Sequence, residues 1–190
     1  LIISPSLNSG GLLEMVTEQN RTIEAVQLAI RMEIDGKEYY LKASQASGNE
    51  LGKKLLLALA AEEDFHRQKF VQIYDTIRNQ QAWPVIILPP DRSKNLKTIF
   101  AAASKTVGSK VKILSTELGA IVKAMDMENK TYDFYQSQSQ KATYNAEREL
   151  YQSVAAEERE HHRLLLNYYE YLKDPAGWFV QQEHPSLDGG

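Results

Sequence analysis

Six glutamate and histidine side chains occur in the sequence at spacings that suit metal ligands on helices. A Glu-x-x-His motif occurs twice, and a further glutamate precedes each motif by 30 residues. Because residues three apart are neighbours on an α-helix, each motif places a carboxylate beside an imidazole. One glutamate from each of two helices and a Glu-x-x-His from each of two others form the ligand set of a dinuclear metal centre. The six residues are Glu33, Glu63, His66, Glu128, Glu158 and His161.

The two ligand sets belong to an internal repeat with an offset of 95 residues. This offset superimposes Ala25 on Ala120 and Tyr40 on Tyr135, without a gap. It also superimposes Ala60-Ala61-Glu62-Glu63 on Ala155-Ala156-Glu157-Glu158. Duplication explains the common origin, and a shared chemical task explains why the polar positions match in both copies.

The elements that must position these residues are four predicted helices. Apolar residues recur three and four positions apart over residues 22–47, 49–79, 115–142 and 145–173, which is the pattern of amphipathic helices. Short turn segments, Ser47-Gly48-Asn49 and Thr143-Tyr144-Asn145, separate the helices within each pair. The fold class is therefore all-α: two antiparallel hairpins, at 22–79 and 115–173, forming a four-helix bundle over residues 22–173.

The spacing also places the six residues at one depth in this bundle. Glu33 and Glu63 each lie 15 residues from Gly48, and Glu128 and Glu158 each lie 15 residues from Thr143. At about 1.5 Å per residue, all four lie roughly 22 Å from their turns. Packing the hairpins together therefore predicts four carboxylates and two imidazoles at one level.

Three further segments complete the predicted organisation. Residues 1–21 are expected to be a loose N-terminal arm. Residues 80–114 contain Trp83-Pro84 and Pro89-Pro90, which exclude one continuous helix. A connection as long as residues 80–114 is expected to cross the bundle and pack on it. Residues 174–190 follow the last predicted helix as a separate C-terminal segment.

The ligand types limit the metal. The chain has no cysteine, which excludes iron–sulfur clusters and rubredoxin-type centres. Oxygen-rich ligation with one imidazole per metal suits iron or manganese, and affinity alone does not exclude zinc. A single Glu-x-x-His is a weak signal, but four unpaired glutamates facing a core would be very costly without cations. Glu62 and Glu157 are alternatives to their neighbours Glu63 and Glu158, whereas His162 is expected to face solvent.

Tyr40 and Tyr135 each follow a candidate glutamate ligand by seven residues, two turns along the same face. One interpretation is aromatic core packing. The other is that each phenol donates a hydrogen bond to a ligand carboxylate and orients it. Tyr39, Phe134, Tyr74 and Tyr169 are expected to be core or bundle-surface aromatics.

Charge and hydropathy exclude other classes of function. With 22 Lys and Arg against 25 Asp and Glu, the net charge is −3. A general nucleic-acid or membrane surface is therefore not expected. No apolar stretch approaches the length of a membrane span, and no targeting signal is visible. We expect a cytoplasmic protein.

At these residues the chain resembles the rubrerythrin-type branch of the ferritin-like superfamily, from about residue 22 to 173. The resemblance implies a bundle with a long crossover, two iron ions per chain, a reaction with hydrogen peroxide or oxygen, and a homodimer. The tail around Asp174–Phe179 also resembles that of stand-alone family members, which implies that residues 174–190 form a C-terminal strap on the bundle. Two departures weaken the comparison with rubrerythrin proper: the four-cysteine rubredoxin domain is absent, and Thr131 occupies the place of an extra glutamate. Without a rubredoxin centre, sustained turnover is expected to need an external electron donor such as a rubredoxin.

The predicted metal ligands and the family resemblance are compatible with three classes of function. The first is an oxidoreductase in oxidative-stress defence that reduces peroxide or reacts with oxygen at two irons. The second is an iron-handling ferroxidase, which would need a hollow assembly for storage. The third is a metal-stabilised module without enzymatic activity.

Overall fold

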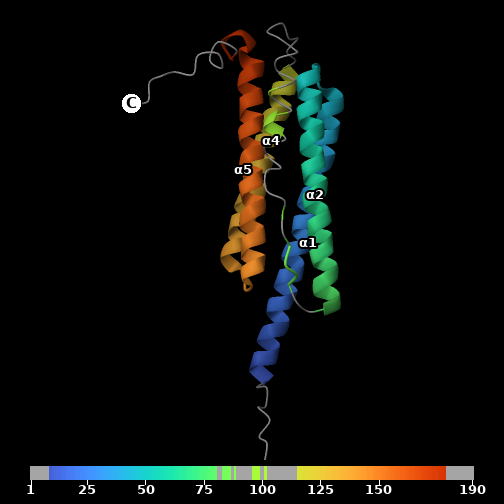
Figure 1. Ribbon diagram of the computed structural model, residues 1–190, viewed down its shortest axis with the longest axis vertical. Helices are drawn as coiled ribbons and strands as arrows, with labels where there is room; N and C mark the ends of the chain where they lie inside the picture. The colour runs from blue at the N-terminus through green and yellow to red at the C-terminus, as the bar shows by residue number, and fades with distance from the viewer. Residues whose placement is uncertain are drawn as a thin grey trace, which may run out of the picture.

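The chain forms a bundle of four long helices, which pair as two hairpins. The computed structural model describes residues 9–80, 83–86, 88, 96–98, 101 and 115–178, and these contain no strand. Figure 1 shows α1 packed along α2 and α4 along α5. The helices are α1 (Ser9–Ala46), α2 (Glu50–Gln80), α4 (Ser115–Lys141) and α5 (Asn145–Lys173). The predicted all-α fold of two antiparallel hairpins is confirmed.

The helix ends agree with the sequence pattern except at the start of α1. The predicted bounds of α2, α4 and α5 fall within one residue of those observed. α1 begins at Ser9 rather than near residue 22, so residues 9–21 are helical and not a loose arm. The Gly10-Gly11 pair suggested irregular structure, but the following residues contain no proline that would stop a helix. This first part of α1 extends past the other helices (Figure 1).

The connection between the hairpins spans the length of the bundle. α2 ends at one end of the bundle and α4 begins at the opposite end (Figure 1). Of the predicted crossover at 80–114, Trp83 and Leu96 are buried against the helices. The remainder of the crossover lies mostly outside the described residues. This topology makes α1 and α4 antiparallel neighbours.

The C-terminal segment is described only as far as Trp178. Residues 175–178 form one further helical turn, and Gly177 N–H donates to Asp174 Oδ1 at 3.0 Å. Trp178 Nε1 donates to Asn167 Oδ1 at 2.7 Å, and the Trp178 ring packs edge-on against Tyr171. The predicted strap beyond this residue lies outside the described part of the chain.

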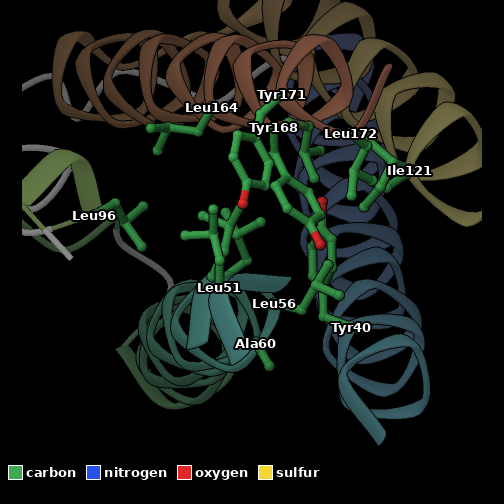
Figure 2. Close-up of a cluster of buried hydrophobic side chains, with 14 of the residues drawn as sticks. Tyr40, Leu51, Leu56, Ala60, Leu96, Ile121, Leu164, Tyr168, Tyr171 and Leu172 are labelled. Atoms are coloured by element: carbon green, nitrogen blue, oxygen red, sulfur yellow. The ribbon is translucent and has the colours of Figure 1, made fainter. Parts of the chain in front are cut away.

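Two apolar clusters fill the bundle, one on each side of its middle. The first contains Tyr40, Leu56, Ile121, Tyr168 and further apolar residues from all four helices. Figure 2 shows Tyr168 and Tyr171 of α5 facing Leu51 and Leu56 of α2 in this cluster. The second cluster is built around Ala29, Phe70, Tyr135 and Tyr151.

Along every helix, the candidate ligands lie between residues of the first cluster on one side and residues of the second cluster on the other. On α1, for example, Glu33 lies between Ala29 and Tyr40. Apolar packing on both sides therefore fixes a belt of acids in the middle of the bundle.

None of the helices in the described residues combines the length and the low charge needed to cross a membrane.

Candidate metal centre

All six predicted ligand residues lie in one buried group at the middle of the bundle. Their side chains are 0–3% exposed. α1 and α4 each supply one glutamate, and α2 and α5 each supply a glutamate and a histidine. The two imidazole rings stack, with centroids 5.9 Å apart. The structure therefore brings together the residues of both Glu-x-x-His motifs and both isolated glutamates.

The six residues form two overlapping ligand groups. Within each group, one ligand atom per residue lies within 4.8 Å of the others. Glu33 and His66 belong to one group, Glu128 and His161 to the other, while Glu63 and Glu158 belong to both. His66 Nδ1 lies 3.5 Å from Glu33 Oε2 and 3.4 Å from Glu158 Oε1. This pattern suits two cations that share two carboxylates.

The distances around the second histidine repeat this arrangement. His161 Nδ1 lies 3.3 Å from Glu63 Oε1 and 3.4 Å from Glu158 Oε2. Glu128 Oε2 is 3.7 Å from the same nitrogen. In both groups, Nδ1 is the imidazole nitrogen that faces the carboxylates.

The unsatisfied polar atoms of the site show what it requires. Seven buried oxygen and nitrogen atoms of the six residues lack a hydrogen-bond partner among the described residues. A buried polar atom without a partner costs free energy. Seven such atoms at one site would strongly destabilise the fold unless a ligand satisfied them. Four carboxylates carry a charge of −4, which two divalent cations neutralise. The donor set therefore fits two metal ions.

Burial and mutual repulsion shift the proton affinities of the acids. Burial, reinforced by the charge of Glu63, raises the pKa of Glu33 well above its usual range. Burial and the neighbouring Glu158 raise the pKa of Glu128 to about 7. For Glu158, burial is outweighed by repeated contacts with the two histidines, and its pKa is lowered. Without metal, the site thus holds protons in place of cations.

The histidines respond to the same carboxylates. Burial disfavours the charged ring of His66, but Glu33 and the other nearby carboxylates outweigh burial and raise its pKa well above the usual value. His161 behaves in the same way, with Glu128 as the main opposing partner. Metal binding must therefore displace protons from imidazoles as well as from carboxylates.

Tyr40 and Tyr135 form hydrogen bonds that cross between the hairpins. The Tyr40 hydroxyl on α1 donates to Glu128 Oε1 on α4. The Tyr135 hydroxyl on α4 donates to Glu33 Oε1 on α1. Both phenols are buried, and burial together with the accepting carboxylate raises their pKa well above 10. Each tyrosine therefore fixes one oxygen of a glutamate and leaves its other oxygen facing the centre.

The neighbouring acids and His162 lie outside both ligand groups. Glu157 Oε2 lies 2.7 Å from His66 Nε2, the ring nitrogen opposite the centre. A carboxylate at that nitrogen fixes the tautomer and the orientation of a metal-binding imidazole. Sequence spacing placed Glu157 near the site but did not reveal this contact, which depends on how α2 and α5 pack. Glu62 is buried, and His162 is half-buried rather than fully exposed.

Gly36 makes a close approach to Glu63 that the sequence analysis missed. A Cβ atom added at Gly36 would lie 3.1 Å from Glu63 Oε2. The 95-residue offset pairs Gly36 with Thr131, whose hydroxyl donates to the backbone carbonyl of Glu128 at 3.0 Å. The repeated motif is therefore flanked by different residues in its two copies.

These features define a class: a ferritin-like helical bundle with a buried centre of four carboxylates and two imidazoles. The family model for rubrerythrin matches residues 24–169, and the chain belongs to the rubrerythrin family. Membership supports a di-iron carboxylate protein. Neither the comparison with curated proteins nor the comparison with solved structures gives a match.

Proposed function

We propose that this chain holds two iron ions and reduces hydrogen peroxide or reacts with oxygen, using electrons from a separate donor. The observation that carries the proposal is the pair of buried ligand groups that share Glu63 and Glu158. Two ions in contact with common carboxylates can act together on one small oxidant. Family membership favours iron over manganese and zinc.

Each residue of the centre has a distinct task in this proposal. Glu33 and His66 would hold one ion and Glu128 and His161 the other, while Glu63 and Glu158 belong to both ligand groups. Tyr40 and Tyr135 fix the outer oxygens of Glu128 and Glu33. The two overlapping groups of buried acids and histidines support this assignment of ligands.

The apolar clusters on either side exclude bulk water from the centre. When bound, two ferrous ions supply two electrons and Lewis acidity, which is enough to reduce one peroxide to water. The residues that surround them hold the charge in a low-dielectric site, where electrostatic interactions are strong. These 190 residues contain no cysteine and so supply no ligand for a rubredoxin-type centre that could replace those electrons.

Metal content tests the ligand assignment. After anaerobic loading, the natural chain is expected to bind two irons, and H66A/H161A is expected to lose most of them, because the only two imidazoles of the ligand groups are removed. H162A is the matched control, since His162 neighbours His161 but belongs to neither group. Retention of two irons by the double variant would contradict the proposal.

Peroxide consumption tests the reaction. The chemically reduced protein alone is expected to perform one turnover per centre, and continued turnover should require an added rubredoxin with its reductase. Many turnovers without any reductant would overturn the proposal and indicate dismutation instead. A hollow assembly seen by light scattering, with iron mineral inside, would instead indicate storage.

A further inference from the structure

A series of aromatic rings connects the metal centre with the crossover segment. Tyr135, whose hydroxyl bonds to Glu33, stacks on Tyr151 with ring centroids 6.0 Å apart. Tyr151 in turn lies 5.9 Å from the ring of Trp83. Phe70 packs beside both tyrosines, at 5.5 and 6.0 Å. Three rings that can lose an electron, those of Tyr135, Tyr151 and Trp83, therefore form a continuous series that starts beside the ligand Glu33.

Two polar atoms in this series have no hydrogen-bond partner among the described residues. They are the Tyr151 hydroxyl and Trp83 Nε1, and both are buried. A phenylalanine at position 151 would fill the same space without an unsatisfied hydroxyl, whose burial costs stability. Packing alone therefore does not explain why position 151 carries a tyrosine. A phenol differs from a phenyl ring chiefly in being much easier to oxidise.

The series is present in only one half of the internal repeat. The 95-residue offset pairs Tyr135 with Tyr40, but it pairs Tyr151 with Leu56. Leu56 is as completely buried in its cluster as Tyr151 is in the other. Bundle packing therefore accepts an aliphatic residue at this position. The same offset pairs Trp83 with Trp178, so the halves differ at the middle ring, Tyr151, and not at the tryptophan.

The outer end of the series lies close to the surface. Trp83 is 9% exposed, and Val85, two residues further on, is 78% exposed. A reductant in solution can therefore approach the Trp83 end of the series, whereas Tyr135 and Tyr151 are completely buried.

We propose that Tyr135, Tyr151 and Trp83 form a path along which single electrons pass between the surface and the metal centre. When peroxide or oxygen has oxidised the centre, Tyr135 would give up one electron to it and pass its phenolic proton to Glu33 Oε1, to which it is already hydrogen-bonded. Tyr151 then reduces Tyr135, which recovers its proton, and Trp83 reduces Tyr151. The Tyr151 hydroxyl has no acceptor among the described residues, so oxidised Tyr151 keeps its proton as a short-lived radical cation until Trp83 reduces it. A one-electron donor at the surface, such as a reduced electron-transfer protein, finally reduces Trp83.

The path rests on the proposed function for its end point, but its rings can be tested without iron. Zinc has no redox chemistry, so zinc-loaded protein isolates the behaviour of the side chains. The azide radical, generated by pulse radiolysis, oxidises tryptophan selectively. In W178F, Trp83 is the only remaining tryptophan, so oxidation begins there and the path is run from its outer end.

In zinc-loaded W178F, the tryptophan radical absorbance is expected to decay as a tyrosine radical grows, at a rate independent of protein concentration. Adding Y151F or Y135F should abolish this transfer, whereas Y39F should leave it unchanged, because Tyr39 contacts Tyr40 and not this series. Y151F is expected to fold, since it removes only an unsatisfied hydroxyl. Equal tyrosine radical yields in all variants would overturn the path. If Y151F abolishes the transfer but Y135F does not, the path ends at Tyr151 and does not reach the metal centre, which would overturn the proposal. Failure of zinc to bind would count against the proposed function, and the same measurement on metal-free protein would still test the rings.

Discussion

At the scale of single residues, the crossed hydrogen bonds from Tyr40 and Tyr135 determine how two ligand carboxylates are presented. Y40F and Y135F each remove one donor and leave Glu128 or Glu33 with an unsatisfied buried oxygen. We expect each substitution to weaken iron binding about 10–100-fold, the usual effect of losing a partner of a metal ligand. Competition with a chelator measures this affinity. Y39F serves as the control. Unchanged iron affinity in both Y40F and Y135F would show that these two rings contribute only to packing of the core.

Gly36 offers a second test at this scale, because it leaves room for the carboxylate of Glu63. Gly-to-Ala in a helix interior usually adds up to about 1 kcal/mol of stability. In G36A the new Cβ would lie 3.1 Å from Glu63 Oε2, so the carboxylate must shift. We expect the metal-free protein to be no less stable but its iron affinity to fall. The control is G119A, where nothing lies within 4 Å, and equal affinity in the two variants would contradict this role.

The sequence predicts which residues form the centre more completely than it predicts their partners. Helical spacing alone places the six ligands at one depth, because rise per residue is constant. It does not show that Tyr40 reaches Glu128 instead of Glu33 on its own helix, or that Glu157 contacts His66. Those contacts depend on the rotation of one helix against another, which side-chain packing fixes.

At the scale of elements, a buried glutamate at the start of α4 holds the turn between α1 and α2. Glu117 Oε1 accepts hydrogen bonds from Ser47 Oγ at 2.5 Å and Tyr168 OH at 2.6 Å. Its other oxygen, Oε2, accepts from the backbone N–H of Gly48 at 3.2 Å. Asn49 caps α2 by accepting from the N–H of Gly52 at 2.7 Å. This network ties one hairpin to the other at the end of the bundle.

We expect E117A to lower the free energy of unfolding by about 1–3 kcal/mol, because it leaves several buried donors without an acceptor. E50A, in the exposed first turn of α2, should change it by less than about 0.5 kcal/mol. Urea denaturation followed by circular dichroism compares the two variants. An equal, small effect in both would show that the network contributes little to the join between the hairpins.

Element boundaries are predictable where turn chemistry and apolar periodicity agree. Both conditions hold for α2 and α5, and their observed ends match the pattern closely. They conflict before residue 22, where Gly10 and Gly11 indicate a turn although the residues that follow can continue a helix. Residue propensities do not include the effect of the long helix that follows. Extending an existing helix costs less free energy than starting a new one.

At the scale of the whole molecule, the metal ions are expected to be part of what holds the bundle together. At a free iron concentration 1,000 times the dissociation constant, binding adds about 4.1 kcal/mol. For a chain of this size, about 2–4 °C per kcal/mol gives a rise in Tm of about 8–16 °C over metal-free protein. Glu128 has a pKa near 7 against its usual 4.5, so its contribution to metal-free stability is present below 4.5 and lost as the pH rises through about 7.

The shifts of Glu33, His66 and His161 act in the same direction, and among the six ligand residues only Glu158 opposes them. His162, outside the centre, also opposes them, because burial lowers its pKa. Iron requires deprotonated ligands and binds better as the pH rises. The difference in Tm between the loaded and metal-free forms should therefore widen from about pH 5.5 to about pH 7.5. Calorimetry at several pH values measures it, and a constant or shrinking difference would contradict the assigned proton affinities.

The crossed tyrosine bonds also carry a record of ancestry. One hairpin holds only half of a centre, and its tyrosine has an acceptor only on the other hairpin. Two identical copies of a single ancestral hairpin, related by a two-fold axis, would satisfy both bonds with one set of residues, as in any isologous contact. Such a pair would complete the centre without a covalent link, and the crossover would then join what was an interface between subunits. Once one chain carries both copies, each half can change independently. The paired positions Gly36 and Thr131 now differ in this way.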